Sequence, residues 1–389
     1  MDPVANPYQP GAGRRPPELA GRAHELKGFD VLVRRCEAGS PDRGWVLHGL
    51  RGVGKTVLLN ELLTLTVNRG WIVTKVEASL GQPVIERVAQ GLHRSLRDAT
   101  GRHGVKRLTR LLAVFRAFSV KVDPAGAYTF GVEIEPIRGV ADSGNLATDL
   151  SELFVELGTT AADLGVGAAL LVDEMQDVGA AELAALNVAV HEVGQGPAPL
   201  PFLLIGAGLP SLPAVLANAT SYAERLYDYR SIGTLDRTST REAFVRPAEA
   251  LGVTWSPAAL DLVLDASRGY PFFVQALGRQ VWDYAASNPI SIDDAEVGIG
   301  YARREIDAGL YLARWLRATP VQRDLLRAIA AMGDDIAVST QEVAQAMGRT
   351  RGTISVPRDE LLSKGILYAP ERGILAFTVP GMSEFVRRQ

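Results

Sequence analysis

The segment GLRGVGKT, residues 49–56, has the residue types and spacing that bind a phosphate chain. It fits the pattern Gly-x-x-x-x-Gly-Lys-[Ser/Thr], in which backbone N–H groups surround the phosphates of a nucleotide. An apolar run precedes it and a helical pattern follows it, as this motif requires. We expect Lys55 to reach the β and γ oxygens of ATP and Thr56 to hold Mg²⁺. The predicted nucleotide contacts from this loop are Gly49, Gly52, Val53, Gly54, Lys55, Thr56 and Val57.

A second group of chemical side chains ends the apolar run AALLVDEMQD. At the end of a strand, Asp173 is placed to hold Mg²⁺ through water, and Glu174 to polarise the water that attacks the γ-phosphate. Glu174 is therefore the predicted base. Gln176 and Asp177 are expected to form a turn and a cap for the following helix.

These groups need a scaffold, and the sequence indicates a parallel sheet. From Trp45 to about Leu235, apolar runs alternate with helical patterns; the runs are WVLH, WIVTKVEA, AALLVDE, PFLLIGA and YRSIGTL. Such runs are typical of strands covered by helices on both faces. The predicted fold class is α/β, with a nucleotide-binding sheet domain over residues 17–236 after a flexible leader at 1–16.

An insertion at about residues 80–148 separates the second and third runs. Its first half is helical and basic, with eight cations against Asp98 alone between residues 87 and 116. This basic surface is a candidate docking site, although a solvated helix face is the commoner origin of such a run. Its second half alternates apolar residues on either side of DPAG, which predicts a β-hairpin over residues 118–134.

Two further domains follow the sheet. Helical periodicity with capping residues predicts an all-helical lid at 237–317. Three helices and a strand pair at 318–389 predict a winged helix-turn-helix, with its recognition helix beginning at about Ser355.

Composition narrows the setting. The formal net charge of −3 gives no global attraction to nucleic acid, so such binding must come from local patches. No apolar run is long enough to span a bilayer, so no membrane partner is expected. Cys36 is the single cysteine and the N-terminus lacks a secretory pattern, which together indicate a cytoplasmic protein.

The order of phosphate loop, Asp-Glu strand, later strand, helical lid and winged helix resembles the AAA+ ATPases, in the clade between origin-recognition and STAND signalling ATPases. This resemblance implies ATP or ADP with Mg²⁺ as cofactors. It also implies that Leu19, Gly21 and Arg22 lie along the adenine, and that Pro271 in SRGYPFF packs on it. By sequence alone, Pro271 is equally consistent with the first turn of a helix.

The resemblance also concerns the arginine that reaches the γ-phosphate of a neighbouring subunit. In SYAERLYDYR it corresponds to Arg225, with Arg230 behind it; a surface ion pair is the alternative role for Arg225. Two features depart from the family. The fourth strand ends in IGAGLP, without the polar side chain that usually helps to position the water, and the lid lacks an arginine in the usual second-sensor place.

The winged helix offers a candidate DNA surface. Residues 320–389 carry nine cations against eight acids, a weak balance for a phosphate binder. The supporting feature is position, since the arginines gather at the recognition helix and the wing; they are Arg349, Arg351, Arg358 and Arg372. The alternative is a winged helix that packs on the ATPase as a regulatory module.

Together these features predict a slow or partner-stimulated ATPase whose nucleotide state controls the lid and the winged helix. We expect it to act on duplex DNA or a DNA-bound partner, alone or as a homo-oligomer. One alternative is a STAND-like signalling switch that ADP holds closed. A second is a DNA-binding regulator with a vestigial ATPase.

Overall fold

The structure is a computed structural model of the chain and describes residues 1–122, 128–130 and 133–389. The chain forms two compact units. The sheet unit comprises Ala23–His48 and Lys55–Ser231, and the lid unit comprises Met1–Arg22, Gly49–Gly54 and Ile232–Gln389. The chain therefore crosses from one unit to the other within GLRGVGKT: residues 49–54 belong to the lid unit, and Lys55 opens a helix of the sheet unit.

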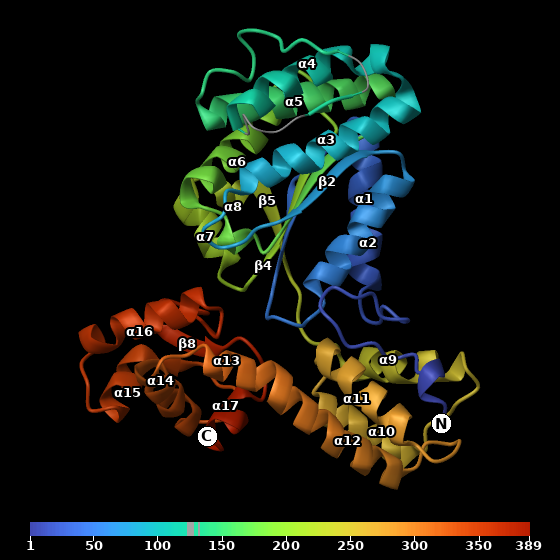
Figure 1. Ribbon diagram of the computed structural model, residues 1–389, viewed down its shortest axis with the longest axis vertical. Helices are drawn as coiled ribbons and strands as arrows, with labels where there is room; N and C mark the ends of the chain where they lie inside the picture. Colours follow the sequence, from blue (N-terminus) through green and yellow to red (C-terminus); the bar gives the residue numbers. More distant parts are fainter. Residues whose placement is uncertain (123–127, 131–132) are drawn as a thin grey trace. The chain divides into compact units, whose positions relative to one another are not determined.

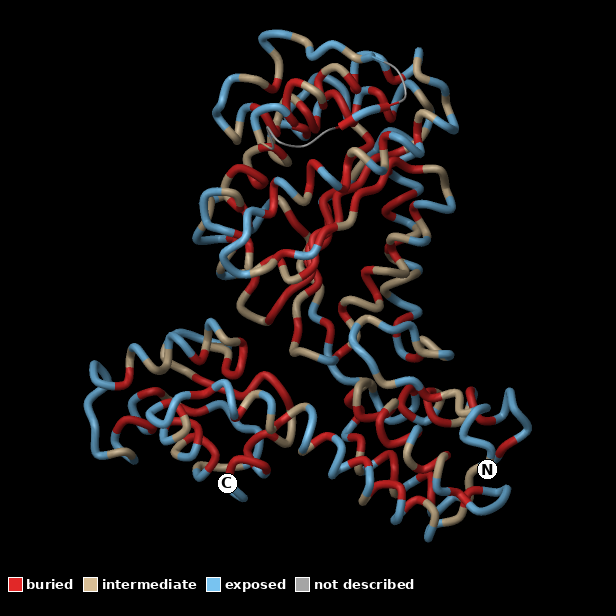
Figure 2. The backbone as a smooth tube through the Cα atoms, viewed as in Figure 1, coloured by how far each residue is buried: buried red, intermediate tan, exposed pale blue. Residues whose placement is uncertain are grey.

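The sheet unit is built on five parallel strands in the order β2-β3-β4-β1-β5 (Figure 1). Their bounds are β1 Gly44–His48, β2 Ile72–Glu77, β3 Ala168–Asp173, β4 Phe202–Gly208 and β5 Tyr227–Ser231. Every residue of β3 and β4 is buried, which explains why these runs are almost continuously apolar (Figure 2). The predicted α/β fold with a parallel sheet is confirmed.

Helices cover the sheet. Helices α1 and α2 lie on one side of the strands and α6, α7 and α8 on the other (Figure 1). The bounds are α1 Ala23–Glu37, α2 Lys55–Asn68, α5 Leu146–Leu164, α6 Ala180–Val193, α7 Leu212–Ala219 and α8 Ala223–Leu226. Because all five strands run in parallel, the segments that follow β1, β3 and β4 leave from the same edge, where ligands of such sheets bind.

The insertion differs from the expectation in its second half. Helices α3 (Val84–His103) and α4 (Val105–Val122) confirm the helical part. The predicted first hairpin strand is wrong, because Phe118, Val120 and Val122 form the last turns of α4. Phe118 continues a buried helical stripe with Leu108, Leu111 and Phe115, so the 3.6-residue period prevails over the local alternation. The predicted turn DPAG lies outside the described residues, and Tyr128 and Phe130 are buried but not in strands.

The lid unit contains the predicted helices. They are α9 Arg237–Glu249, α10 Pro257–Ser267, α11 Pro271–Tyr284 and α12 Ile292–Ile306. Ser256 and Ser291 cap α10 and α12 by accepting hydrogen bonds from backbone N–H groups, as their positions in the sequence predict. Helix α12 continues through a π-helical turn, Asp307–Tyr311, into α13, Leu312–Leu316.

The C-terminal region holds α14 Pro320–Ala331, α15 Thr340–Ala346, α16 Arg351–Ser363 and α17 Met382–Arg387. Its three-stranded sheet has the order β6-β8-β7, with β6 at Val338–Ser339, β7 at Leu367–Tyr368 and β8 at Ile374–Phe377. Helix α16 begins at Arg351 rather than at about Ser355, because Thr350 caps it by accepting from the Thr353 N–H.

The segment expected to be a flexible leader contacts the lid. Tyr8 is buried, its hydroxyl donates to the Phe244 carbonyl, and its ring meets Trp282 edge-on at a centroid distance of 6.4 Å. The Trp282 indole N–H donates to the Asp2 carbonyl at 2.9 Å. Pro and Gly in this stretch therefore indicate irregular backbone, and the tyrosine anchors it to the helices. Within the described ranges, every helix is too short or too polar to span a bilayer.

Candidate nucleotide-binding site

The loop Gly49–Gly54 has the backbone that its glycines allow. Gly52 and Gly54 have φ angles of +82° and +94°, in the region that favours glycine. A Cβ on Gly49 would collide with the Ile232 carbonyl, so this position also excludes a side chain. The predicted loop residues thus form the tight turn between β1 and α2 that presents backbone N–H groups to a phosphate.

Lys55 and Thr56 open helix α2. Lys55 is buried, with 7% of its surface exposed, while Thr56 and Val57 are half-buried. A helix N-terminus carries partial positive charge, and Lys55 adds a full charge, so this end of α2 favours an anion. Burial, together with the charge of Lys55, lowers the pKa of His48 at the end of β1.

Asp173 ends β3 and is buried. Its carboxylate accepts the N–H of Glu174 at 3.0 Å and lies 3.7 Å from the ammonium of Lys75 on β2. Lys75 also donates to the side-chain oxygen of Asn60. The strand pairing explains the ion pair, because Lys75 faces Leu171 and lies two residues from the partner of Asp173. Lys75 is a site residue that the sequence reasoning missed.

Glu174 has a left-handed backbone, with φ +48° and ψ +41°. This conformation is uncommon for a residue other than glycine and is held where the surrounding structure enforces it. Residues Met175–Asp177 then form a 3-10 turn, as expected for a turn before α6. The unexpected feature is Gln176, whose side chain donates to Glu174 Oε2 at 2.8 Å and accepts from the Leu209 N–H at 2.9 Å.

The segment predicted to lie along the adenine contacts the phosphate loop. Arg22 is buried and donates to the carbonyls of Val53, at 3.0 Å, and Gly233, at 2.6 Å. Gly21 has φ +67° and no room for a Cβ against Leu235 and Ser239. Leu19 is half-buried. Arg22 therefore fixes the loop backbone, a role distinct from the adenine contact implied by the resemblance.

The lid also contacts the phosphate loop. A Cβ on Gly52 would lie 2.5 Å from the Tyr270 hydroxyl, and the Phe272 N–H donates to the Gly52 carbonyl at 3.3 Å. Pro271, between them, is half-buried at the first position of α11, so it serves as the helix start that the sequence allows. Tyr270 is buried, and burial raises the pKa of its hydroxyl.

Two arginines accompany Tyr270. Arg51 of the loop is close to the C-terminal region, since a Cβ on Gly365 would lie 2.8 Å from its guanidinium. Arg314 of α13 is half-buried and donates to the Leu310 carbonyl at 2.9 Å. Burial and the charge of Arg51 both lower the pKa of Arg314. In residues 1–122, 128–130 and 133–389, Arg314 pairs with no carboxylate.

The two candidate arginines for a neighbouring subunit differ in their surroundings. Arg225 on α8 is exposed and has no hydrogen-bond or ion-pair partner among the described residues. Arg230 on β5 pairs with Asp228 at 2.5 Å and lies over the Trp45 ring at 4.6 Å from its centroid. Arg230 is therefore held within its own sheet unit.

The four C-terminal arginines divide into two groups. Arg351 lies beside the turn between β7 and β8, where a Cβ on Gly373 would be 3.7 Å from its guanidinium, and Arg372 is in the same turn. Both are exposed, as is Arg349. Arg358 is half-buried and pairs with Asp359 at 2.7 Å.

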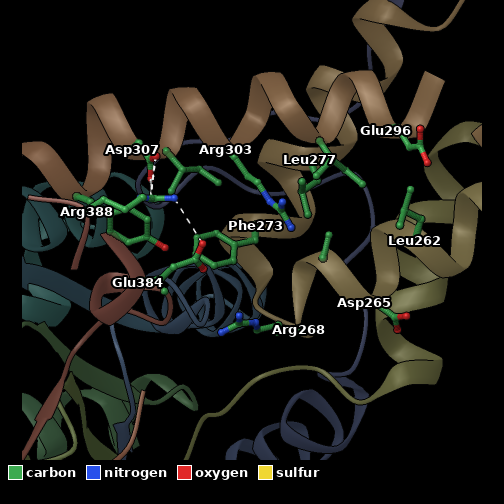
Figure 3. A pocket seen from close by; sticks show the side chains of 15 residues that line it. Leu262, Asp265, Arg268, Phe273, Leu277, Glu296, Arg303, Asp307, Glu384 and Arg388 are labelled. Carbon is green, nitrogen blue, oxygen red and sulfur yellow. Dashed lines mark hydrogen bonds and ion pairs between the residues drawn. The ribbon is translucent and has the colours of Figure 1, made fainter. Parts of the chain in front are cut away.

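The lid unit also has a cavity of about 460 Å³ between the lid helices and the C-terminal region (Figure 3). Apolar side chains such as Leu262, Phe273 and Leu277 line it, and charged side chains surround them. Arg388 closes one end through two hydrogen bonds of 3.0 Å to Asp307. No residue of the phosphate loop lines this cavity, so it is distinct from the candidate nucleotide site.

Comparison with known proteins agrees with this geometry. Residues 18–205 match the AAA ATPase domain family. The phosphate loop, the acid-ended strand and this match together support an AAA ATPase domain. Residues 308–386 match a domain family of unknown function, DUF8462. No curated protein is significantly similar to the chain in sequence.

Solved structures show the same fold. The Walker-type ATPase of Pyrococcus abyssi is 16% identical with a TM-score of 0.58, over 97% of this chain and 98% of that one. The ORC2 protein of Aeropyrum pernix, solved in ADPNP-ADP complexes, is 13% identical with a TM-score of 0.56, over 97% and 96%. RuvB of Thermotoga maritima is 17% identical with a TM-score of 0.47, over 92% and 93%.

Proposed function

We propose that this protein binds and slowly hydrolyses ATP, and that the nucleotide controls the arrangement of its lid and C-terminal region. One observation carries the proposal: the loop Gly49–Gly54 is contacted by Tyr270 and Phe272 of the lid, while its Arg51 lies beside Gly365 of the C-terminal region. A phosphate that orders this loop must alter the same contacts. ATP and ADP therefore differ in the lid and C-terminal arrangement that they favour.

The hydrolytic chemistry follows from the residues at the strand ends. Lys55 neutralises charge on the β and γ oxygens, and Glu174 orients the attacking water. The Thr56 hydroxyl and the Asp173 carboxylate are oxygen donors of the kind that Mg²⁺ takes together with nucleotide phosphates, so the donor set fits this ion. When bound, Mg²⁺ supplies charge neutralisation on the phosphate oxygens. Low turnover is expected, because no polar side chain extends from the end of β4.

Arg225 is the residue that we assign to the active site of a neighbouring subunit. Its exposed guanidinium, without a partner in the described parts of the chain, is available to a second molecule. Arg230 is engaged with Asp228 and Trp45. Full turnover then requires a homo-oligomer, and Arg225→Ala reduces the turnover of the assembly without reducing ATP binding.

For the C-terminal region we propose a winged helix that contacts duplex DNA. Three helices and the small sheet β6-β8-β7 support it, with α16 in the place of a recognition helix. Arg349 and Arg351 at the start of α16 and Arg372 in the β7–β8 turn are exposed and fit phosphate contacts. Arg358 is a weaker candidate, because Asp359 already neutralises it.

A STAND-like switch is the second candidate function. The observation in its favour is the Gly-Tyr-Pro segment, residues 269–271, which contacts the phosphate loop through Tyr270. In that case the purified protein retains ADP, turns over negligibly and changes mass on exchange for ATP. The nucleotide content of the purified protein separates this function from the first.

One experiment tests the main proposal. ATP hydrolysis is measured for the wild type and for Glu174→Gln, with and without duplex DNA, beside the molecular mass in ADP and in ATP. We expect Glu174→Gln to bind ATP as the wild type does and to lose turnover at least about a hundredfold. Unchanged turnover removes Glu174 from its role, and an unchanged rate with DNA argues against action on duplex DNA.

A further inference from the structure

The end of β4 has space where a side chain would normally lie. A Cβ on Gly206 would lie 2.5 Å from the Met175 sulfur, and a Cβ on Gly208 would collide with the Gln176 Oε1. Neither glycine has a positive φ, so backbone conformation does not require them. The glycines are needed for space: they admit two consecutive side chains from the turn that follows β3.

The Gln176 amide has a single consistent orientation. The Leu209 N–H can only donate, so the atom that faces it at 2.9 Å must be the amide oxygen. The amide nitrogen then faces Glu174 Oε2 at 2.8 Å and donates to it. One side chain thus connects the residue after β4 to the carboxylate proposed as the base.

Glu174 is restrained at both its backbone and its side chain. Its left-handed conformation sets the direction of the side chain, and the Gln176 N–H holds one of its two carboxylate oxygens. A restrained carboxylate orients a water more effectively than a mobile one, because less order must be created as the reaction proceeds.

We propose that Gln176 is a positioning residue for hydrolysis, which supplies from the β3 side the polar group that the end of β4 lacks. The inference rests on the proposed role of Glu174 and adds a route of control. Leu209 immediately precedes α7, and α8 with Arg225 follows α7. A shift of the segment after β4 is therefore passed through the Gln176 amide to the Glu174 carboxylate.

The test compares Gln176→Ala, Gln176→Glu and Glu174→Gln in the full chain with Mg²⁺ and ATP. Gln176→Ala is expected to lower kcat about tenfold to a hundredfold, with KM for ATP and ADP affinity within about twofold of wild type. Gln176→Glu retains an acceptor for the Leu209 N–H but places a second carboxylate beside Glu174. That charge raises the pKa of Glu174, so the acidic limb of the kcat–pH profile moves to higher pH.

A fourth variant guards against misfolding of Gln176→Ala. Gly208→Ala displaces the Gln176 amide without removing it, so it is expected to lower kcat like Gln176→Ala. In the double variant the two losses should not multiply, because both act through the same hydrogen bond. The positioning role is overturned if Glu174→Gln is inactive while both Gln176 variants retain wild-type kcat and pH profile. Wild-type turnover of Glu174→Gln would instead overturn the proposed function.

Discussion

The Tyr270 hydroxyl of the lid lies against Gly52 of the phosphate loop, so close that a Cβ on Gly52 would be 2.5 Å from its oxygen. The lid thus contacts the loop in the middle of GLRGVGKT, where the second of its four glycine or lysine positions adopts a positive φ. Any ligand that reshapes this loop acts on Tyr270 directly.

The first prediction concerns Gly52→Ala, with Gly54→Ala as the matched control. Both residues have positive φ angles, so each substitution strains the backbone by about 1 kcal/mol. Only the Gly52 variant also displaces Tyr270, because a Cβ on Gly54 meets nothing within 4 Å. Proteolysis of the lid should accelerate in Gly52→Ala alone. Equal acceleration in the two variants would show that the lid contact is unimportant.

The second prediction concerns Arg314. Without nucleotide, Arg314→Gln should leave the free energy of unfolding unchanged or raise it, because the substitution removes repulsion from Arg51. Under the proposed function, ATP affinity should fall about tenfold, and more than ADP affinity, since a terminal phosphate adds the charge that these cations face. Exposed Arg317→Gln is the control. Isothermal titration and thermal unfolding measure both effects; equal losses for ATP and ADP would contradict the assignment.

The third prediction concerns Lys75→Met. It leaves the carboxylate of Asp173, which has 4% of its side chain exposed, without its cation at 3.7 Å. The free energy of unfolding should fall by about 1–3 kcal/mol without Mg²⁺ and ATP. Mg²⁺ with ATP should reverse part of this loss, because Asp173 is a proposed ligand. Lys27→Met, at an exposed lysine of α1, should change little. Denaturant unfolding with and without Mg²⁺ and ATP provides the measurement.

The fourth prediction concerns pH. Burial and Lys55 lower the pKa of His48 from its ordinary value of 6.5. The unfolded chain then binds the proton more readily than the native one, so stability is full above pH 6.5 and falls as the pH drops toward the native pKa. His48→Gln should flatten this slope. The pKa of His103 is also lowered, by burial and two arginines, so His103→Gln is measured beside it. A slope unchanged in His48→Gln would contradict the assignment.

Much of the site is visible in the sequence because it depends on local patterns. The phosphate loop is a continuous motif, and Asp173 and Glu174 directly follow an apolar run. Parallel strands then bring these segments to one edge of the sheet. The locations of Lys55 at the start of α2 and Asp173 at the end of β3 follow from these facts alone.

Other features need partners that are distant in the sequence. Gln176 is recognisable only when Leu209 and the space above Gly208 are known, and Lys75 only when β2 is aligned with β3. The hairpin prediction was wrong because a short alternation around Phe118 coincided with the end of a longer helical stripe. The contact of Arg22 with Val53 likewise depends on a loop brought together by the fold.

The docked N-terminal segment has a practical consequence. Its backbone at Asp2 accepts from the Trp282 indole, and Tyr8 packs on the same ring. Indole emission shifts to longer wavelength when the ring is released to water, so Trp282 serves as an optical reporter of docking. Four other tryptophans contribute background, and the signal is isolated by comparing the chain with a Trp282→Phe variant. Fusions and labels attached before Tyr8 would disturb the helices they were meant to leave alone.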